Sequence, residues 1–142
     1  MRVEPDAIER ILDQATEALE NSKSQILEIS AFARQEQEAL RAELQRVMEE
    51  LAGTIDAVDS LETRYRRSRV RLVEVSRDFK RFSEQDIREA YENTTRIQLE
   101  LTVNREKESN LRTYRDDLQK RIRNIERTIE RADVLYSQMT VV

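Results

Sequence analysis

Apolar residues recur every seven positions along the first half of the chain, in two rows that run side by side. The first row starts at Leu12, and members of the second row, which starts at Leu44, follow members of the first by four residues. Two such rows are the a and d positions of a coiled-coil seam, and a strict period of seven implies left-handed supercoiling. The first row is Leu12, Leu19, Ile26, Ala33, Leu40, Val47, Thr54, Leu61, Ser68, Val75 and Phe82. The second row is Leu44, Leu51, Val58, Tyr65, Leu72 and Phe79.

Before residue 40 the partner row follows the first row by three residues instead of four. Its members are Ile8, Ala15, Ser22 and Ile29. This change of phase is a stutter centred on the polar run 34–38, and stutters locally unwind a coiled coil. The sequence leaves open whether residues 1–33 continue the first helix or fold separately.

The residues from Phe82 to Ile87 predict the start of a new helix. Ser83 can accept a hydrogen bond from the backbone N–H of Asp86, and the Asp86 carboxylate can accept one from the N–H of Ser83, which makes a capping box. Phe82 and Ile87 stand at the two positions of a hydrophobic staple. We therefore expect a fold-back near residues 81–84.

A second heptad pattern runs from Ile87 to the end of the chain. Its a row is Ile87, Thr94, Leu101, Glu108, Arg115, Ile122, Ile129 and Tyr136. Its d row is Ala90, Ile97, Asn104, Leu111, Leu118, Ile125, Ala132 and Met139. The pattern stops at residues 139–142 with no glycine, proline or cap, which suggests that it was cut from a longer sequence.

Together these patterns predict an all-α fold of two long coiled-coil helices arranged as a helical hairpin in one domain, residues 1–142. The first helix covers about residues 7–81, starting at a capping box of Asp6 and Glu9, and the second covers about residues 84–140. The twelve apolar seam residues of the second helix are too many for one partner helix to cover. We therefore expect obligate dimerisation into a coiled coil or a four-helix-bundle-like assembly.

The composition agrees with long helices and excludes several kinds of site. Of 142 residues, 38% are charged, and only one glycine and one proline are present, which leaves almost no turn chemistry for a β-fold. Without histidine or cysteine the chain lacks the common zinc sites and the nucleophiles of triad enzymes. We expect no catalytic, cofactor-binding or metal-binding residues. No apolar run approaches a membrane span and no signal peptide opens the chain, so we expect a cytoplasmic protein.

Charge is segregated along the chain, whose net charge is −4. Residues 1–63 carry 15 acids and 6 bases, whereas residues 64–81 carry 8 bases and 2 acids. This basic stretch could bind nucleic acid or an anionic partner. The favoured alternative is a solvated face that pairs with acids across the turn, namely Glu84, Asp86, Glu89 and Glu92.

Three polar residues interrupt the second seam between Leu101 and Leu118. They are Asn104, Glu108 and Arg115. Such a layer is a candidate conformational pivot or small-molecule site, and loosely hydrated packing is the alternative. Ser76 and Ser83 are candidate phosphorylation sites, against the simpler interpretation of an ordinary helical serine and a capping serine.

Four segments carry a resemblance to the sensor region of the DegS family of histidine kinases. They are residues 71–92 (RLVEVSRDFKRFSEQDIREAYE), 98–102 (QLELT), 111–118 (LRTYRDDL) and 137–142 (SQMTVV). The resemblance is strongest from about Tyr65 to the end of the chain. It implies the input domain of a cytoplasmic two-component kinase without a membrane span, in which a phosphoacceptor-histidine helix and an ATP-binding domain follow.

The resemblance further implies that the downstream kinase core uses ATP and Mg²⁺ and phosphorylates a DegU-like response regulator that controls transcription. No catalytic residue carries over, because this chain has no histidine. We expect the last seam layers to form a parallel two-fold coiled coil that passes helix movements to the kinase: Leu118, Ile122, Ile125, Ile129, Ala132, Tyr136 and Met139. The alternatives are a structural coiled coil without a signalling role and a nucleic-acid-binding protein acting through residues 64–81.

Overall fold

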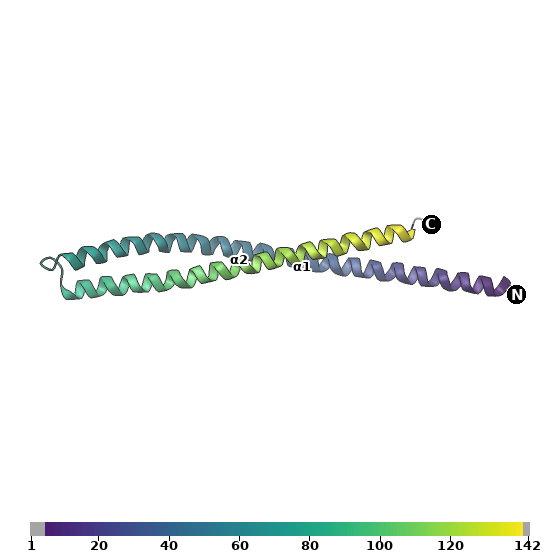
Figure 1. Cartoon of the computed structure of the whole chain (residues 1–142), viewed down its shortest axis with the longest axis horizontal. Coiled ribbons are helices and arrows are strands. Elements are labelled where there is room, and N and C mark those ends of the chain that lie inside the picture. The colour runs from purple at the N-terminus through teal and green to yellow at the C-terminus, as the bar shows by residue number, and fades with distance from the viewer. Residues whose placement is uncertain (1–4, 141–142) are drawn as a thin grey trace. The chain divides into compact units, whose positions relative to one another are not determined.

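The computed structural model describes residues 5–140, which form two long α-helices and no strand. Helix α1 spans Pro5–Arg77 and helix α2 spans Glu84–Thr140. The two helices are joined at residues 78–83 into an antiparallel hairpin (Figure 1). The predicted all-α helical hairpin is therefore confirmed.

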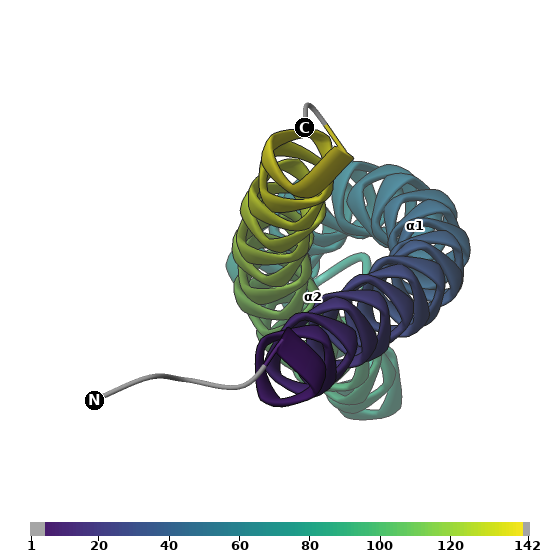
Figure 2. The same cartoon turned by 90° about the vertical axis from the view of Figure 1, so that its right-hand side faces the viewer.

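The contacts divide the chain into two units. Unit 2 is residues 44–117 and contains the turn; unit 1 combines residues 1–43 with residues 118–142. The first described turn of α1 and the last described turn of α2 lie at the same end of unit 1 (Figure 2).

Unit 2 is held together by the predicted seam. Val58 and Leu61 of α1 pack with Ile97 and Leu101 of α2, and Tyr65 lies against this cluster. All four aliphatic side chains are buried, so the a and d rows of both helices meet as the heptad pattern requires. Ion pairs flank the seam: Arg105 to Glu62 at 2.8 Å and Lys107 to Glu50 at 3.4 Å.

Unit 1 repeats this arrangement with different residues. Arg34 pairs with Asp133 at 2.8 Å, and Arg41 pairs with Glu126 at 3.2 Å. Each of these four residues directly follows a d position and so stands at position e of the heptad. In antiparallel helices the e positions of the two helices face each other, which explains these pairs. The pairs are exposed, so each contributes at most about 1 kcal/mol to the free energy of unfolding. Their main effect is to favour this register of α1 against α2.

The register upstream of residue 40 differs from the prediction. Ile29 is 53% exposed, whereas its neighbour Ser30 is buried and its hydroxyl lies 3.4 Å from a carboxylate oxygen of Asp133. The seam positions that are buried or half-buried are 26, 30, 33, 37, 40 and 44, which alternate steps of four and three; position 43, next to the seam, is half-buried as well. The expected stutter was therefore wrong, and α1 runs through residues 34–38 as one continuous helix.

Both ends of α1 also differ from the expected ones. Helix α1 includes Pro5, so Asp6 lies inside its first turn rather than at a cap; proline fits a first helical position because it has no N–H to satisfy. At the other end α1 stops at Arg77, not residue 81, since the six residues 78–83 are needed to reverse the chain. Phe79, expected in the seam, is therefore 80% exposed. Residues 141 and 142, at the end of the expected uncapped terminus, lie outside the described residues.

Candidate functional site

The turn is built by hydrogen bonds that the sequence encodes locally. The backbone N–H groups of Arg81 and Phe82 both donate to the Asp78 carbonyl, at 3.3 and 3.1 Å. The Ser83 N–H donates to the Asp86 carboxylate at 2.8 Å, and the Asp86 N–H donates to the Ser83 hydroxyl at 3.2 Å. These last two are the reciprocal bonds of the expected capping box. Ile87 and Phe82, the staple positions, are both half-buried.

The cap also changes the acidity of Asp86. The hydrogen bonds from the Ser83 backbone and side chain hold the pKa of the Asp86 carboxyl below its ordinary value, and the Arg71 guanidinium adds to the effect. Because these donors favour the charged carboxylate, the start of α2 is best capped when Asp86 is ionised.

The three polar residues of the second seam lie within it, as the heptad pattern places them, and are half-buried. Their bonding partners all belong to α2. Asn104 donates to the Glu100 carbonyl at 2.8 Å. Glu108 accepts from Arg112 at 3.2 Å.

The third member of this set, Arg115, pairs with Asp116 at 3.0 Å. Within residues 5–140 none of the three polar side chains bonds to α1. These layers therefore satisfy their polar atoms without joining the two helices, and no buried side-chain polar atom of the described residues is left without a partner.

A second polar layer, closer to the turn, does join the helices. The hydroxyl groups of Ser68 in α1 and Thr94 in α2 are 2.6 Å apart and buried. Thr94 also donates to the Ala90 carbonyl at 2.8 Å, and the Asn93 amide donates to the Ser68 hydroxyl at 3.3 Å. The sequence placed Ser68 and Thr94 in their seams but did not pair them. The sequence feature that could have predicted this contact is the presence of one hydroxyl residue in each of the two apolar rows.

The seam at the end of α2, which we expected to pair with a second copy, packs against α1 of the same chain. Leu118 is fully buried, Ile122 and Ile129 are buried, and Ile125, Tyr136 and Met139 are half-buried. All sixteen seam positions of α2 are at least half-buried, opposite α1. The expectation that one helix cannot cover this seam was therefore wrong, because α1 is long enough to do so.

The two candidate phosphorylation sites lie in different settings. Ser76 is half-buried in α1 next to Val75, which is buried. Ser83 is exposed, and its hydroxyl is engaged in the capping box. Phosphorylation of Ser76 or Ser83 stays a prediction.

Among the described residues no ion pair joins the basic stretch 64–81 to the acids of α2, although Arg71 lies near enough to Asp86 to help lower its pKa. Within the described residues its one ion pair joins Arg71 to Glu74, at 3.7 Å within α1. Two of the remaining cations contact aromatic rings: Arg69 lies 5.9 Å from the centroid of the Tyr65 ring, and Arg81 lies 5.5 Å from that of the Phe82 ring.

Among residues 5–140 there is neither a group of side chains placed to bind a metal ion nor a membrane-spanning helix. No group of three or more acidic, histidine or cysteine side chains in that range is arranged to hold an ion. Neither described helix has a stretch both long and apolar enough to cross a bilayer.

Comparison with known proteins gives a consistent answer. The family model "Sensor protein DegS" matches residues 9–142. A signal transduction histidine-protein kinase/phosphatase DegS from Bacillus subtilis (strain 168) is 38% identical over 99% of this chain. A protein of the same description from Brevibacillus brevis is 40% identical over 98% of it.

The chain spans 37% and 36% of the lengths of these two relatives. No solved structure matches it. The match to the family model covers nearly all of the chain, including the seam, the turn and the polar layers. This chain belongs to the DegS sensor protein family.

Proposed function

We propose that this chain is the signal-input and dimerisation domain of a cytoplasmic two-component kinase. In this proposal α2 passes a helix movement to a kinase core that follows it, and that core, using ATP and Mg²⁺, phosphorylates a DegU-like response regulator. The relatives are histidine kinase/phosphatases, and the chain corresponds to about a third of their length. The chain itself would not be an enzyme.

The observation that carries the proposal is the contrast between the two polar layers of unit 2. The Ser68–Thr94 pair fixes α2 to α1 near the turn. Glu108 and Arg115 bond only along α2. A seam layer without bonds across the helices resists sliding or rotation less than an interdigitated apolar layer does, and packed helices switch between discrete arrangements. These layers are suited to act as the pivot of α2.

A homodimer in this proposal uses the outer faces of the helices, since each chain fills its own seam. Exposed apolar side chains on both helices of unit 1 support a four-helix-bundle-like assembly of two copies. They include Ile29, Phe32, Val134 and Leu135. Grouped apolar side chains at a surface are typical of interaction sites.

The pivot is tested by filling the polar layers. In the Glu108→Leu/Arg115→Leu variant two half-buried charges become apolar seam residues, so we expect the free energy of unfolding to rise by about 1–3 kcal/mol. With the chain fused to the catalytic region of the Bacillus subtilis relative, the same variant should hold autophosphorylation at one fixed level. Urea denaturation and incorporation of labelled phosphate measure the two effects.

The matched control makes the same two changes on the exposed surface of α2, as Glu106→Leu/Arg121→Leu. This control should alter neither stability nor autophosphorylation appreciably. A stabilised seam variant whose autophosphorylation equals that of the parent would reject the pivot and favour a purely structural coiled coil.

A further inference from the structure

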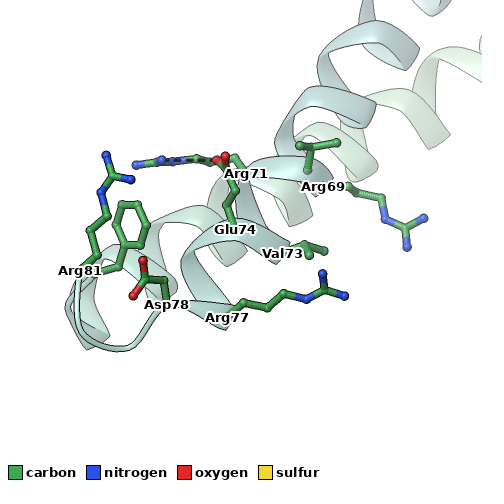
Figure 3. Close-up of a pocket in the computed structure, with 9 residues that line it drawn as sticks. Arg69, Arg71, Val73, Glu74, Arg77, Asp78 and Arg81 are labelled. Carbon is green, nitrogen blue, oxygen red and sulfur yellow. Dashed lines mark ion pairs between the residues drawn. The ribbon is translucent and has the colours of Figure 1, made fainter.

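A groove at the end of α1 next to the turn combines positive charge with apolar surface (Figure 3). Its volume is about 590 Å³, within the range of protein binding sites. Arg69, Val73 and Arg77 point to the same side of α1 in Figure 3, as their spacing of four residues requires. Arg81 and Phe82 of the turn line the groove as well.

Of the four arginines that line this groove, Arg71 pairs with Glu74 and the other three form no ion pair in the described structure. Arg69, Arg77 and Arg81 have no carboxylate partner within residues 5–140. Elsewhere in the same unit, cations such as Arg105 and Lys107 are paired across the helices. Since the chain as a whole is acidic, this local excess of unpaired arginines is a specific feature and not a consequence of composition.

Part of the groove is held in place by stacking on one aromatic ring. The guanidinium carbons of Arg71 and Arg81 lie 4.7 and 5.5 Å from the centroid of the Phe82 ring. Cation–π contacts of this kind limit the motion of long side chains. Binding of a partner to Arg81 therefore costs less side-chain conformational entropy.

The groove also has an apolar component. Val70 is 65% exposed and Val73 is 46% exposed, although both belong to a helix with a packed seam. A ligand that matches the groove must therefore offer anionic groups and apolar surface together.

A protein segment fits these features better than a nucleic acid does. Glu74 and Asp78 also line the groove and would repel a continuous phosphodiester backbone. The Phe82 ring already carries two guanidinium groups, so it is a poor platform for stacking bases. Carboxylates on a peptide can instead meet individual arginines and avoid the two acids.

We propose that this groove docks an acidic segment of a partner protein. The partner's carboxylates pair with Arg69, Arg77 and Arg81, and an apolar side chain of the partner packs on Val70 and Val73. The inference stands apart from the pivot, because it concerns what binds at the turn and not how α2 moves.

The test is a binding assay with the purified chain and a fluorescein-labelled acidic peptide, EEDLEEFLEEDE, followed by fluorescence anisotropy. A second peptide with serine at the three apolar positions isolates the apolar contribution. Charge reversal in the groove, Arg69→Glu/Arg77→Glu/Arg81→Glu, should weaken binding of the first peptide by about tenfold or more. Val70→Ser/Val73→Ser should remove the preference for the first peptide over the second.

The matched control reverses three exposed arginines of the same basic stretch outside the groove, Arg64→Glu/Arg66→Glu/Arg67→Glu. It changes the net charge equally and should weaken binding by less than about threefold. Circular dichroism verifies helicity, and Arg69→Gln/Arg77→Gln/Arg81→Gln replaces the reversal if that variant unfolds.

Three results would overturn the proposal. They are absence of peptide binding at low salt, equal losses in the groove and control variants, and tighter groove-dependent binding of oligothymidine or of phosphatidylglycerol vesicles than of the peptide. The last result would assign the groove to a nucleic acid or to a membrane surface.

Discussion

At the scale of single residues, the buried hydroxyl pair Ser68–Thr94 joins α1 to α2 within the seam of unit 2. Each hydroxyl has a further bond: Thr94 donates to the Ala90 carbonyl within α2, and Ser68 accepts from the Asn93 amide across the helices. Removing one partner therefore leaves the other satisfied. A single substitution therefore loses hydrogen bonds but leaves no buried hydroxyl without a partner.

We predict that Ser68→Ala and Thr94→Val each lower the free energy of unfolding by about 1 kcal/mol. The double variant should lose less than the sum of the two, with a coupling energy of about 0.5–1.5 kcal/mol. Urea denaturation of the four proteins measures this cycle. Thr102→Val is the control, since its hydroxyl is exposed and bonds only to the Gln98 carbonyl of the same helix. Additive losses would show that the pair does not join the helices.

At the scale of the element, the start of α2 depends on the charge of Asp86. Its pKa is lowered in the folded protein by the Ser83 hydrogen bonds. A depressed folded pKa gives stability that is present above the unfolded pKa and is lost as the pH falls through the folded pKa. The contribution of the cap should thus be complete above about pH 5 and decrease progressively below about pH 4, as the pH falls through the folded pKa.

We predict that Asp86→Asn is less stable than the unchanged protein at pH 7 and that the difference shrinks in acid. Thermal unfolding followed by circular dichroism at fixed ionic strength measures it. Glu84→Gln, in the same helical turn but outside the capping box, is the control and should give no such pH-dependent difference. If the difference in stability between Asp86→Asn and the parent stayed constant from pH 7 to pH 3, the role of the carboxylate would be contradicted.

The elements that the sequence predicts well are those set by neighbouring residues. The Ser83–Asp86 box spans four positions, and the α2 seam follows one unbroken heptad from Ile87. The register of α1 upstream of residue 40 was missed, because Ile29 is the better apolar candidate by local pattern. Ser30 is buried instead, next to Asp133, which lies 103 positions away.

In the candidate site, too, contacts between neighbours in the sequence could be predicted, whereas contacts between distant residues could not. The heptad pattern placed Asn104, Glu108 and Arg115 in the seam, and their partners within α2 lie one to four residues away. The Ser68–Thr94 pair and the groove at the turn depend on which residues the hairpin brings together. The early end of α1 at Arg77, which exposes Phe79 and helps to form the groove, depends on the room needed to reverse the chain.

At the scale of the whole molecule, a hairpin that fills its own seam changes how two copies can meet. The α2 seam residues from Leu118 to Met139 are covered by α1, so a second copy has no open seam to enter. What unit 1 does expose is apolar surface on the outer faces of its helices. Phe32 in α1 is 68% exposed and Leu135 in α2 is 42% exposed.

We predict that the chain is a dimer at micromolar concentration and that Phe32→Glu/Leu135→Glu weakens the dimer by about tenfold or more. The physical reason is that an interface built on apolar side chains must desolvate the two new charges. Sedimentation velocity measures the association, and helicity should be unchanged because neither side chain is buried. Phe79→Glu, at a phenylalanine of the turn that is 80% exposed, is the control and should leave the dimer intact. A monomeric parent chain would remove the dimer from the proposed function, and a dimer insensitive to the double variant would place its interface elsewhere on the hairpin.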